Sequence, residues 1–171
     1  LNCPSTDYTE AEVEKIEAYL NEYKNMIFFY GAEVPKLANL EQYFKEWGVT
    51  YEYSMVCDSS YRVLGNYTNI VSVPTNTADR LVEGLNTNNY VVMPSSREMH
   101  PTSVKSSLIT VTDLLNTSSV AYSKSLAGGP VASYEKEDGD TTGPFSTAIL
   151  SSKYTIINNE YYYANVLFIS S

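Results

Sequence analysis

The chain has 171 residues, of which 43% are hydrophobic and 18% charged, and its formal net charge is −9 at pH 7. This length fits one domain that can bury a core without disulfides or metals. Only 11 Lys and Arg stand against 20 Asp and Glu, and they form no cluster for phosphate backbones or anionic lipids. We therefore expect neither nucleic-acid binding nor direct lipid binding.

The first third of the chain alternates between helix and strand patterns. The segment Thr9-Glu10-Ala11-Glu12 has capping-box form and opens a predicted helix over residues 9–24. An apolar run, Met26–Tyr30, then predicts a buried strand. A second helix is expected from about Leu37 to Trp47, closed by Gly48 in a left-handed cap, and Val49–Val56 alternates as a strand does. This order predicts an α/β fold with an open, mostly parallel sheet flanked by helices.

The remainder of the chain predicts mostly strands and loops within the same single domain, 1–171. We expect a surface loop at Asp58–Asn69, a short helix at Thr77–Leu85 and a buried strand at Tyr90–Met93. Further strands are predicted at Ile70–Val73, Ser107–Leu115 and Val120–Ser123, with an antiparallel pair, Thr147–Ile157 and Tyr161–Ile169, at the end of the sheet. The expected core includes Val13, Ile16, Leu20, Phe28, Leu40, Phe44, Val91 and Leu167.

The residues that could support catalysis are few. His100 is the only histidine, so a hydrolase would have to pair it with Cys57 or with a serine. His100 stands beside Pro101 in a predicted loop, and Cys57 leads into loop with a carboxylate, Asp58, next to it, which disfavours a thiolate. We therefore expect no enzymatic activity, two buried thiols at Cys3 and Cys57, and no cofactor.

No metal site is expected either. The acidic run from Glu135 to Asp140 could offer carboxylates to calcium, but it lacks the ligand spacing of a calcium loop. A solvated charge run is the commoner explanation of such a segment.

A ligand crevice is expected where polar residues follow the predicted parallel strands. Ligands of open α/β sheets gather outside the carboxyl ends of the strands. In this chain those positions hold Glu33, Asp58, Ser95, Ser96 and Arg97. Asp58 and Arg97 would pair across the crevice, or Arg97 would bind a carboxylate or phosphate group of a small anionic or cell-envelope ligand.

Several segments together resemble one protein family. The opening Pro4-Ser-Thr-Asp7-Tyr-Thr-Glu10-Ala-Glu12 and the stretch Asn39-Leu40 through Trp47-Gly48-Val49 to Met55-Val56-Cys57-Asp58 match its pattern in order. So do Tyr90-Val91-Val92-Met93-Pro94 and Gly143-Pro144-Phe145 through Ile149-Leu150. This order of segments resembles the gliding-motility-type ABC transport auxiliary domain. The chain departs from the pattern at Asn25, where a glycine pair usually precedes the strand, and at its final residues.

The resemblance implies a flavodoxin-like or glutamine-amidotransferase-like sheet on the extracytoplasmic side of a bacterial membrane. The chain would be a soluble fragment of a longer protein, anchored by transmembrane segments outside the fragment and docking on an ABC permease or other membrane components. The resemblance implies no set of catalytic residues in this chain. A carbohydrate-binding or adhesive surface module remains an alternative, and exposed tyrosines and Trp47 lined up in one groove would favour it.

Overall fold

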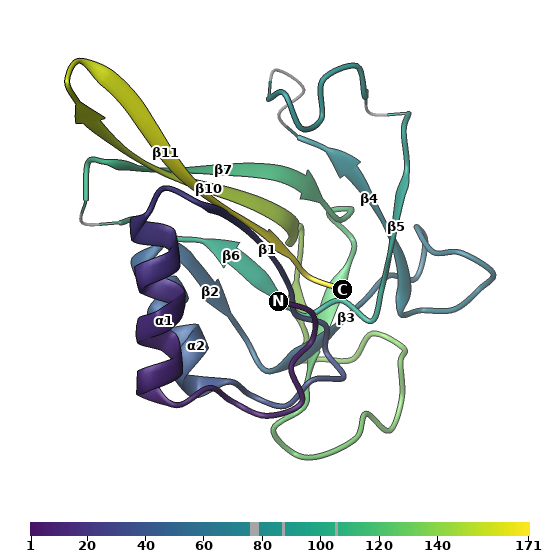
Figure 1. The fold of residues 1–171 in the computed structure, drawn as a ribbon. Helices are drawn as coiled ribbons and strands as arrows, with labels where there is room; N and C mark the ends of the chain where they lie inside the picture. The colour runs from purple at the N-terminus through teal and green to yellow at the C-terminus, as the bar shows by residue number, and fades with distance from the viewer. Residues whose placement is uncertain (76–78, 87, 105) are drawn as a thin grey trace.

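The computed structural model describes residues 1–75, 79–86, 88–104 and 106–171. Two helices and eleven strands are assigned within these ranges (Figure 1). The helices are α1 (Glu10–Asn21) and α2 (Ala38–Glu46). The strands are β1 (Asn25–Phe29), β2 (Val49–Tyr51), β3 (Ser54–Cys57), β4 (Asn69–Pro74), β5 (Val91–Pro94), β6 (Met99–Pro101), β7 (Ile109–Asn116), β8 (Tyr122–Ser125), β9 (Thr141–Thr142), β10 (Ser146–Ile157) and β11 (Glu160–Ile169).

The prediction of an open, mostly parallel α/β sheet is wrong. Strands make up 38% of the structure and helices 13%, and the main sheet is curled and mixed. Its six strands have the order β1-β11-β10-β7-β4-β5, and only β1 and β11 run parallel. Two small antiparallel sheets, β2-β6 and β3-β8-β9, complete the fold. Hydrophobic periodicity identified most strands, but it does not encode the direction in which their partners run.

Two predicted elements differ in detail. The alternating run Val49–Val56 is interrupted after Tyr51, so that β2 and β3 belong to different small sheets. The predicted helix Thr77–Leu85 falls partly outside the described residues, and the described part, 79–85, forms turns instead of a helix. The antiparallel pair near the C-terminus is confirmed as β10 and β11, but β11 lies inside the sheet, between β1 and β10.

Both predicted N-terminal helices are confirmed. The capping box of α1 is present, with Thr9 and Glu12 exchanging bonds at the first turn. Gly48 follows α2 with a φ of 78°, and a Cβ there would lie 2.5 Å from the Val111 side chain. Both the left-handed backbone and the close packing therefore require glycine at this position.

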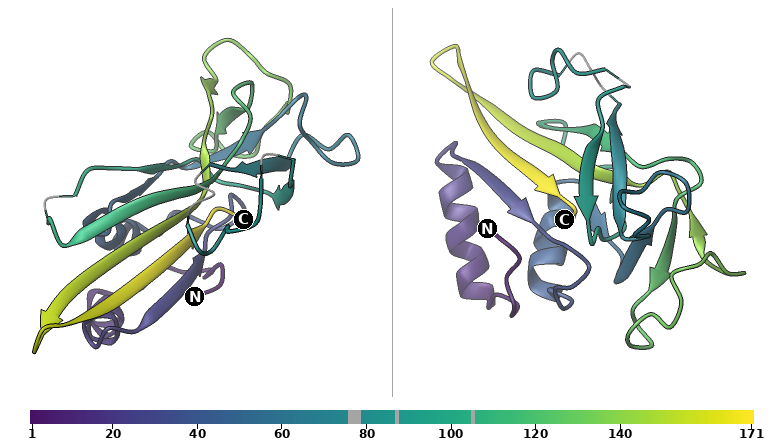
Figure 2. Two further views of the ribbon diagram at one scale, coloured as in Figure 1. Left: turned by 90° about the horizontal axis from the view of Figure 1, so that it is seen from above. Right: turned by 90° about the vertical axis from the view of Figure 1, so that its right-hand side faces the viewer.

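The largest core lies between the two helices and one face of the main sheet, as Figures 1 and 2 show. Phe44 of α2 packs against Phe28 of β1 and Phe168 of β11, with ring centroids 4.6 and 4.9 Å apart. Each fully buried side chain of this size contributes about 1.5–3 kcal/mol. Of the expected core, four side chains are buried (Leu20, Phe28, Leu40 and Phe44), and four are half-buried (Val13, Ile16, Val91 and Leu167).

The two ends of the described chain lie close together (Figure 1). Asn2 forms a parallel bridge with Phe29 at the outer edge of β1, and the Cys3 thiol lies 3.6 Å from the carbonyl oxygen of Ser171. Within the described residues, neither helix is long and apolar enough to cross a membrane.

Candidate functional site

Asp58 is the best-connected of the predicted site residues. It follows β3 directly, is fully buried, and accepts hydrogen bonds from the backbone N–H groups of Ser60 and Tyr61, at 2.7 and 2.8 Å. Its second carboxylate oxygen accepts a bond from the hydroxyl of Ser118, sixty residues further along the chain. Asp58 therefore fixes two separate loops with one side chain, and its carboxylate is used within the protein.

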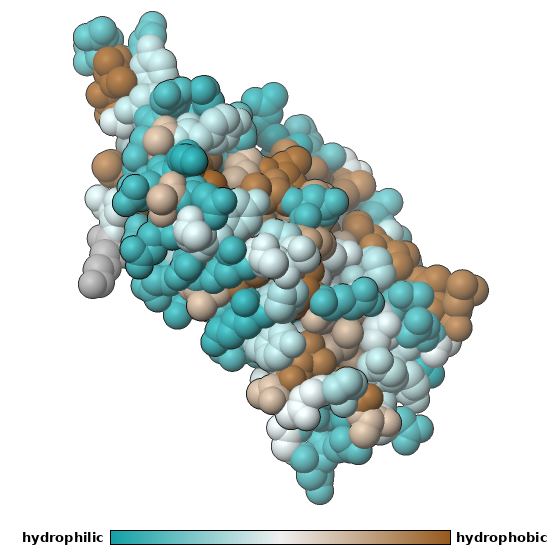
Figure 3. Space-filling model, turned by 60° about the horizontal axis from the view of Figure 1, so that its bottom comes forward, coloured by the Kyte–Doolittle hydropathy of each residue, from teal (hydrophilic) through white to brown (hydrophobic). Residues whose placement is uncertain are grey.

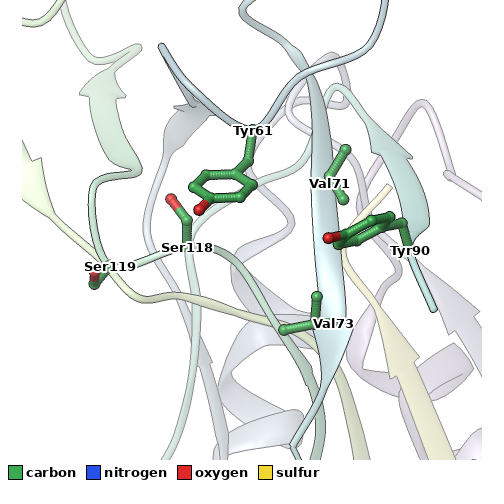
Figure 4. Close-up of a pocket in the computed structure, with 6 residues that line it drawn as sticks. All are labelled: Tyr61, Val71, Val73, Tyr90, Ser118 and Ser119. Carbon is green, nitrogen blue, oxygen red and sulfur yellow. The ribbon is translucent and has the colours of Figure 1, made fainter. Parts of the chain in front are cut away.

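The two loops fixed by Asp58 form walls of a pocket of about 320 Å³ (Figure 4). Its floor comes from β4, whose alternation buries Ile70 and Ser72 and turns Val71 and Val73 outward. The Tyr61 ring and Ser118 lie on one side, and the Tyr90 ring lies on the other, across β4. The lining residues are Tyr61, Val71, Val73, Tyr90, Ser118 and Ser119. We call this site the tyrosine pocket.

The tyrosine pocket presents aromatic surface without charge. The Tyr61 side chain is 52% exposed and the Tyr90 side chain 61% exposed. None of the six lining side chains is charged. Such a site offers two ring faces for stacking, an aliphatic floor and hydroxyl groups that donate or accept hydrogen bonds. It suits an uncharged ligand group with an apolar face.

Glu33 and Ser95 meet, as the predicted crevice required. The Ser95 hydroxyl donates to the Glu33 carboxylate at 2.9 Å, and the backbone N–H of Ala32 donates to the Ser95 carbonyl at 2.7 Å. Ser96 is buried, and its hydroxyl bonds to the carbonyl of Met93. The two contacts of Ser95 connect the loop after β1 with the loop after β5, so they hold the two loops together within the fold.

Arg97 lies inside the protein instead of facing a crevice. Its guanidinium is fully buried, lies 3.9 Å from the centre of the Tyr30 ring, donates to the carbonyl of Val34 and forms an ion pair with Glu41 at 3.6 Å. The expected pair between Asp58 and Arg97 is wrong, because each of the two has other partners. The crevice was expected at the carboxyl ends of several parallel strands, but among the described strands of the main sheet only β1 and β11 run parallel.

The two residues considered for catalysis are placed as follows. Burial raises the pKa of the Cys57 thiol to about 12, so the sulfur is protonated at neutral pH. His100 bonds through Nε2 to Glu98 at 2.8 Å, and the Ser123 hydroxyl donates to the same Glu98. The carboxylate thus stands between serine and histidine, whereas a catalytic triad requires the imidazole in the middle. Both cysteines are free thiols, with Cys57 buried and Cys3 half-buried.

The acidic run near Glu135 is held by a lysine. Lys124, whose side chain is buried, bonds to Glu137 at 2.8 Å and to Asp140 at 2.9 Å. Across the ranges that the structure describes, no group of three or more Asp, Glu, His or Cys side chains is arranged to hold a metal ion. The outer surface is otherwise mixed, and the face in Figure 3 shows separate small apolar patches among hydrophilic residues.

Sequence reasoning identified Asp58 but missed Tyr61, Tyr90 and Ser118. The signal for the tyrosines was weak, because tyrosine is common in sheets whether or not it binds a ligand. The alternation of Ile70, Val71, Ser72 and Val73 could have shown that one valine face of the strand points outward. The contribution of Ser118 depends on a contact across sixty residues, which local patterns do not encode.

No protein-family model matches this chain, and neither does any curated protein. Among solved structures, the chain is similar to the "mmIFT52 N-terminal domain", with a TM-score of 0.62 and 14% sequence identity. The likeness covers 99% of this chain and 63% of that one, so the chain spans less than two thirds of its length. At this identity the likeness concerns the fold, and it agrees with a β-rich domain.

Proposed function

We propose that this chain is a non-catalytic binding domain whose ligand or partner segment enters the tyrosine pocket. The observation that carries the proposal is the pair of exposed rings, Tyr61 and Tyr90, over an outward-facing valine floor, with the backbone of Tyr61 held by the buried carboxylate of Asp58. Tyrosine supplies rigid contact area at low entropic cost, and such rings are enriched where proteins bind their partners.

The proposed setting is the extracytoplasmic side of a bacterial ABC-type transport system. This part of the proposal rests on the order of segments that resembles the gliding-motility-type auxiliary domain. The domain would act as an accessory component that docks on an ABC permease or on other membrane components through the parent protein. The flavodoxin-like part of the expectation has been corrected above, so the setting depends on the sequence segments alone.

A carbohydrate-binding module is the second candidate, and one observation favours it. Tyr61 and Tyr90 line one pocket, and tyrosine rings can stack on the apolar face of a sugar ring. Trp47 counts against this candidate because it is buried at the C-terminal end of α2. The pocket lining also lacks carboxylate and amide side chains, whose paired acceptors and donors suit neighbouring sugar hydroxyls.

The geometry gives less support to a hydrolase that uses Cys57 or a serine with His100. A nucleophilic cysteine acts as a thiolate, and burial holds the Cys57 sulfur protonated. A nucleophilic serine must reach the imidazole, yet the Ser123 hydroxyl bonds to Glu98. These contacts favour the binding proposal over the catalytic one.

The test is site-specific photo-crosslinking in the full-length protein in its native cells. A photo-reactive amino acid replaces Tyr61 or Tyr90, and the adducts are identified by mass spectrometry. We expect an adduct with an ABC permease subunit or another envelope component. The matched control position is Tyr134, which is 44% exposed but lies outside the pocket. Adducts no stronger at the pocket positions than at the control would refute the proposal.

A second variant tests the role of the buried carboxylate. Asp58→Ala removes the acceptor that holds the loops of Tyr61 and Ser118. We expect crosslinking at position 90 to fall by about tenfold, since a displaced aromatic anchor costs at least about 1–2 kcal/mol of binding. An unchanged crosslinking yield in Asp58→Ala would show that binding in the tyrosine pocket does not depend on the Asp58 carboxylate. Adducts with polysaccharide alone would favour the second candidate.

A further inference from the structure

A second pocket, with a different set of lining residues, lies beside the small β3-β8-β9 sheet. Its volume is about 420 Å³, and it is lined by Glu52, Tyr53, Ser54, Glu98, Ser123, Ser125, Gly139, Asp140 and Thr141. Ser54 pairs with Ser125 across β3 and β8, and Val56 pairs with Ser123. Ser54, Ser123 and Ser125 therefore share one face of this sheet. We call the site the serine–glutamate pocket.

Glu98 places a negative charge inside this pocket. Its side chain is 7% exposed, and its two oxygens are bound by His100 Nε2 at 2.8 Å and by the Ser123 hydroxyl. Burial acts to raise the pKa of Glu98, but the hydrogen bonds from His100 and Ser123 outweigh it and hold the pKa below its usual value. Glu98 is therefore an anion at neutral pH.

Ser54 is incompletely satisfied in the same pocket. The residue is only 4% exposed, and its hydroxyl oxygen has no hydrogen-bond partner within the described part of the chain. The same hydroxyl helps to lower the pKa of Glu98, although its contact with the carboxylate does not have the geometry of a hydrogen bond. Because buried polar groups in native proteins are nearly always bonded, this oxygen indicates a position for a ligand or water donor.

The surrounding charges favour a cation. Glu52 and Asp140 also line the pocket, which adds two carboxylates to that of Glu98. Lys124, which bonds to Asp140 and to Glu137, offsets part of this negative charge, and His100, when protonated, offsets part of the charge of Glu98. An anionic ligand would be repelled, and the described side chains form no group suited to a metal ion. An organic cation remains the fitting class.

We propose that the serine–glutamate pocket binds a primary ammonium group, with Glu98 as its counter-ion and Ser54 as a second acceptor. An ammonium carries three donors and no acceptor, which matches a carboxylate surrounded by hydroxyl oxygens. A guanidinium prefers both oxygens of one carboxylate together, and in Glu98 each oxygen already has a partner. This inference is independent of the tyrosine pocket.

The ammonium group has two sources, a lysine side chain of a partner protein or a small free alkylamine. Titration of the isotope-labelled chain, followed by NMR, distinguishes them with two probes, butylammonium chloride and the capped peptide acetyl-Gly-Lys-Gly-amide. We expect both to shift the amide signals of Ser54, Ser123 and Gly139. Peptide binding at least about tenfold tighter than that of butylammonium would identify a lysine side chain, and equal affinity would identify a free amine.

Uncharged and guanidinium probes supply the controls. Butanol and the peptide with an acetylated lysine should leave the pocket signals unchanged, because both lack the charge. The corresponding arginine peptide should bind about tenfold more weakly than the lysine peptide, since it finds no free pair of carboxylate oxygens. An arginine peptide that binds as tightly as the lysine peptide would overturn the assignment to a primary ammonium.

Two variants test the residues. Glu98→Gln keeps the shape and removes the charge, and we expect its affinity to fall by about tenfold to a hundredfold. Ser54→Ala removes a hydroxyl that has no hydrogen-bond partner among the described residues and only helps to lower the pKa of Glu98, so the variant should fold normally and lose about threefold to tenfold in affinity. It therefore keeps the test decisive if Glu98→Gln does not fold.

The matched control is Glu135→Gln, an exposed carboxylate in the neighbouring acidic loop that does not line the pocket. It should bind both probes as the parent does. Absence of shifts at the pocket amides of the parent would overturn the proposal. So would equal affinity in the parent and Ser54→Ala together with shifts spread evenly over the acidic surface.

Discussion

Replacing Arg97 tests whether this residue stabilises the core or binds a ligand. In Arg97→Ala, the buried Glu41 loses its ion-pair partner, the carbonyl of Val34 loses a donor, and the Tyr30 ring loses the cation stacked 3.9 Å from its centre. Removing one member of a buried pair costs about 3–5 kcal/mol. Domains of this size are stable by only about 5–15 kcal/mol. We therefore expect Arg97→Ala to lose about 3–5 kcal/mol of unfolding free energy.

The contributions can be separated with a double-mutant cycle measured by urea denaturation. Arg97→Met keeps the apolar stem but leaves the Glu41 carboxylate uncompensated, whereas Arg97→Met with Glu41→Gln removes both charges. Because isosteric removal of both partners is often close to neutral, we expect the double variant to be more stable than Arg97→Met alone, by about 1–2 kcal/mol. Burial lowers the pKa of Arg97, but a guanidinium still carries its charge at neutral pH. Arg97→Ala with stability within about 1 kcal/mol of the parent would refute this account.

Two further predictions concern titratable groups. Burial raises the pKa of the Cys57 thiol to about 12. Iodoacetamide at about pH 8 should therefore modify the half-buried Cys3 in the folded chain and leave Cys57 unmodified until urea unfolds the protein. Rapid labelling of Cys57 in the folded protein would contradict this prediction. The hydrogen bond to Glu98 raises the pKa of His100, so its stabilising effect is fully present below the unfolded value of about 6.5 and disappears as the pH rises through the folded value. We therefore expect His100→Gln to lower the urea midpoint more at about pH 5.5 than at about pH 8.5. The same loss of midpoint at both pH values would exclude a contribution from the charge of His100.

Local signals predicted the elements whose geometry is set by nearby residues. The capping box at Thr9 predicted the start of α1, and Gly48 predicted the end of α2. The alternating segments Thr147–Ile157 and Tyr161–Ile169 predicted the β10–β11 hairpin, whose tip holds Asn158 and Asn159 with positive φ. The pairing of strands could not be predicted from local patterns, because β11, the strand that pairs with β1, comes about 140 residues later in the sequence.

The candidate sites show the same division. The sequence identified Asp58 as a polar residue at the end of a strand. In the structure its buried carboxylate is stabilised by three hydrogen-bond donors, and one of them, Ser118, is distant in sequence. Glu98 and Ser54 come together because residues 96–98 bond to the backbone around β3, where the N–H of Glu52 donates to the Glu98 carbonyl and the N–H of Val56 donates to the Ser96 carbonyl.

The place of β11 in the sheet has a consequence for how the chain folds. Because β11 lies between β1 and β10, the apolar faces of α1, β1 and α2 remain without their partner until residues 160–169 have been synthesised. The chain loses conformational entropy when it closes a loop of this length, before the new contacts stabilise it. Topologies dominated by contacts between distant residues therefore fold slowly. During synthesis, Phe28 and Phe44 would be open to chaperones or to aggregation. A nascent chain halted before Glu160 should therefore expose an aromatic surface that is prone to aggregation and that is buried in the completed protein.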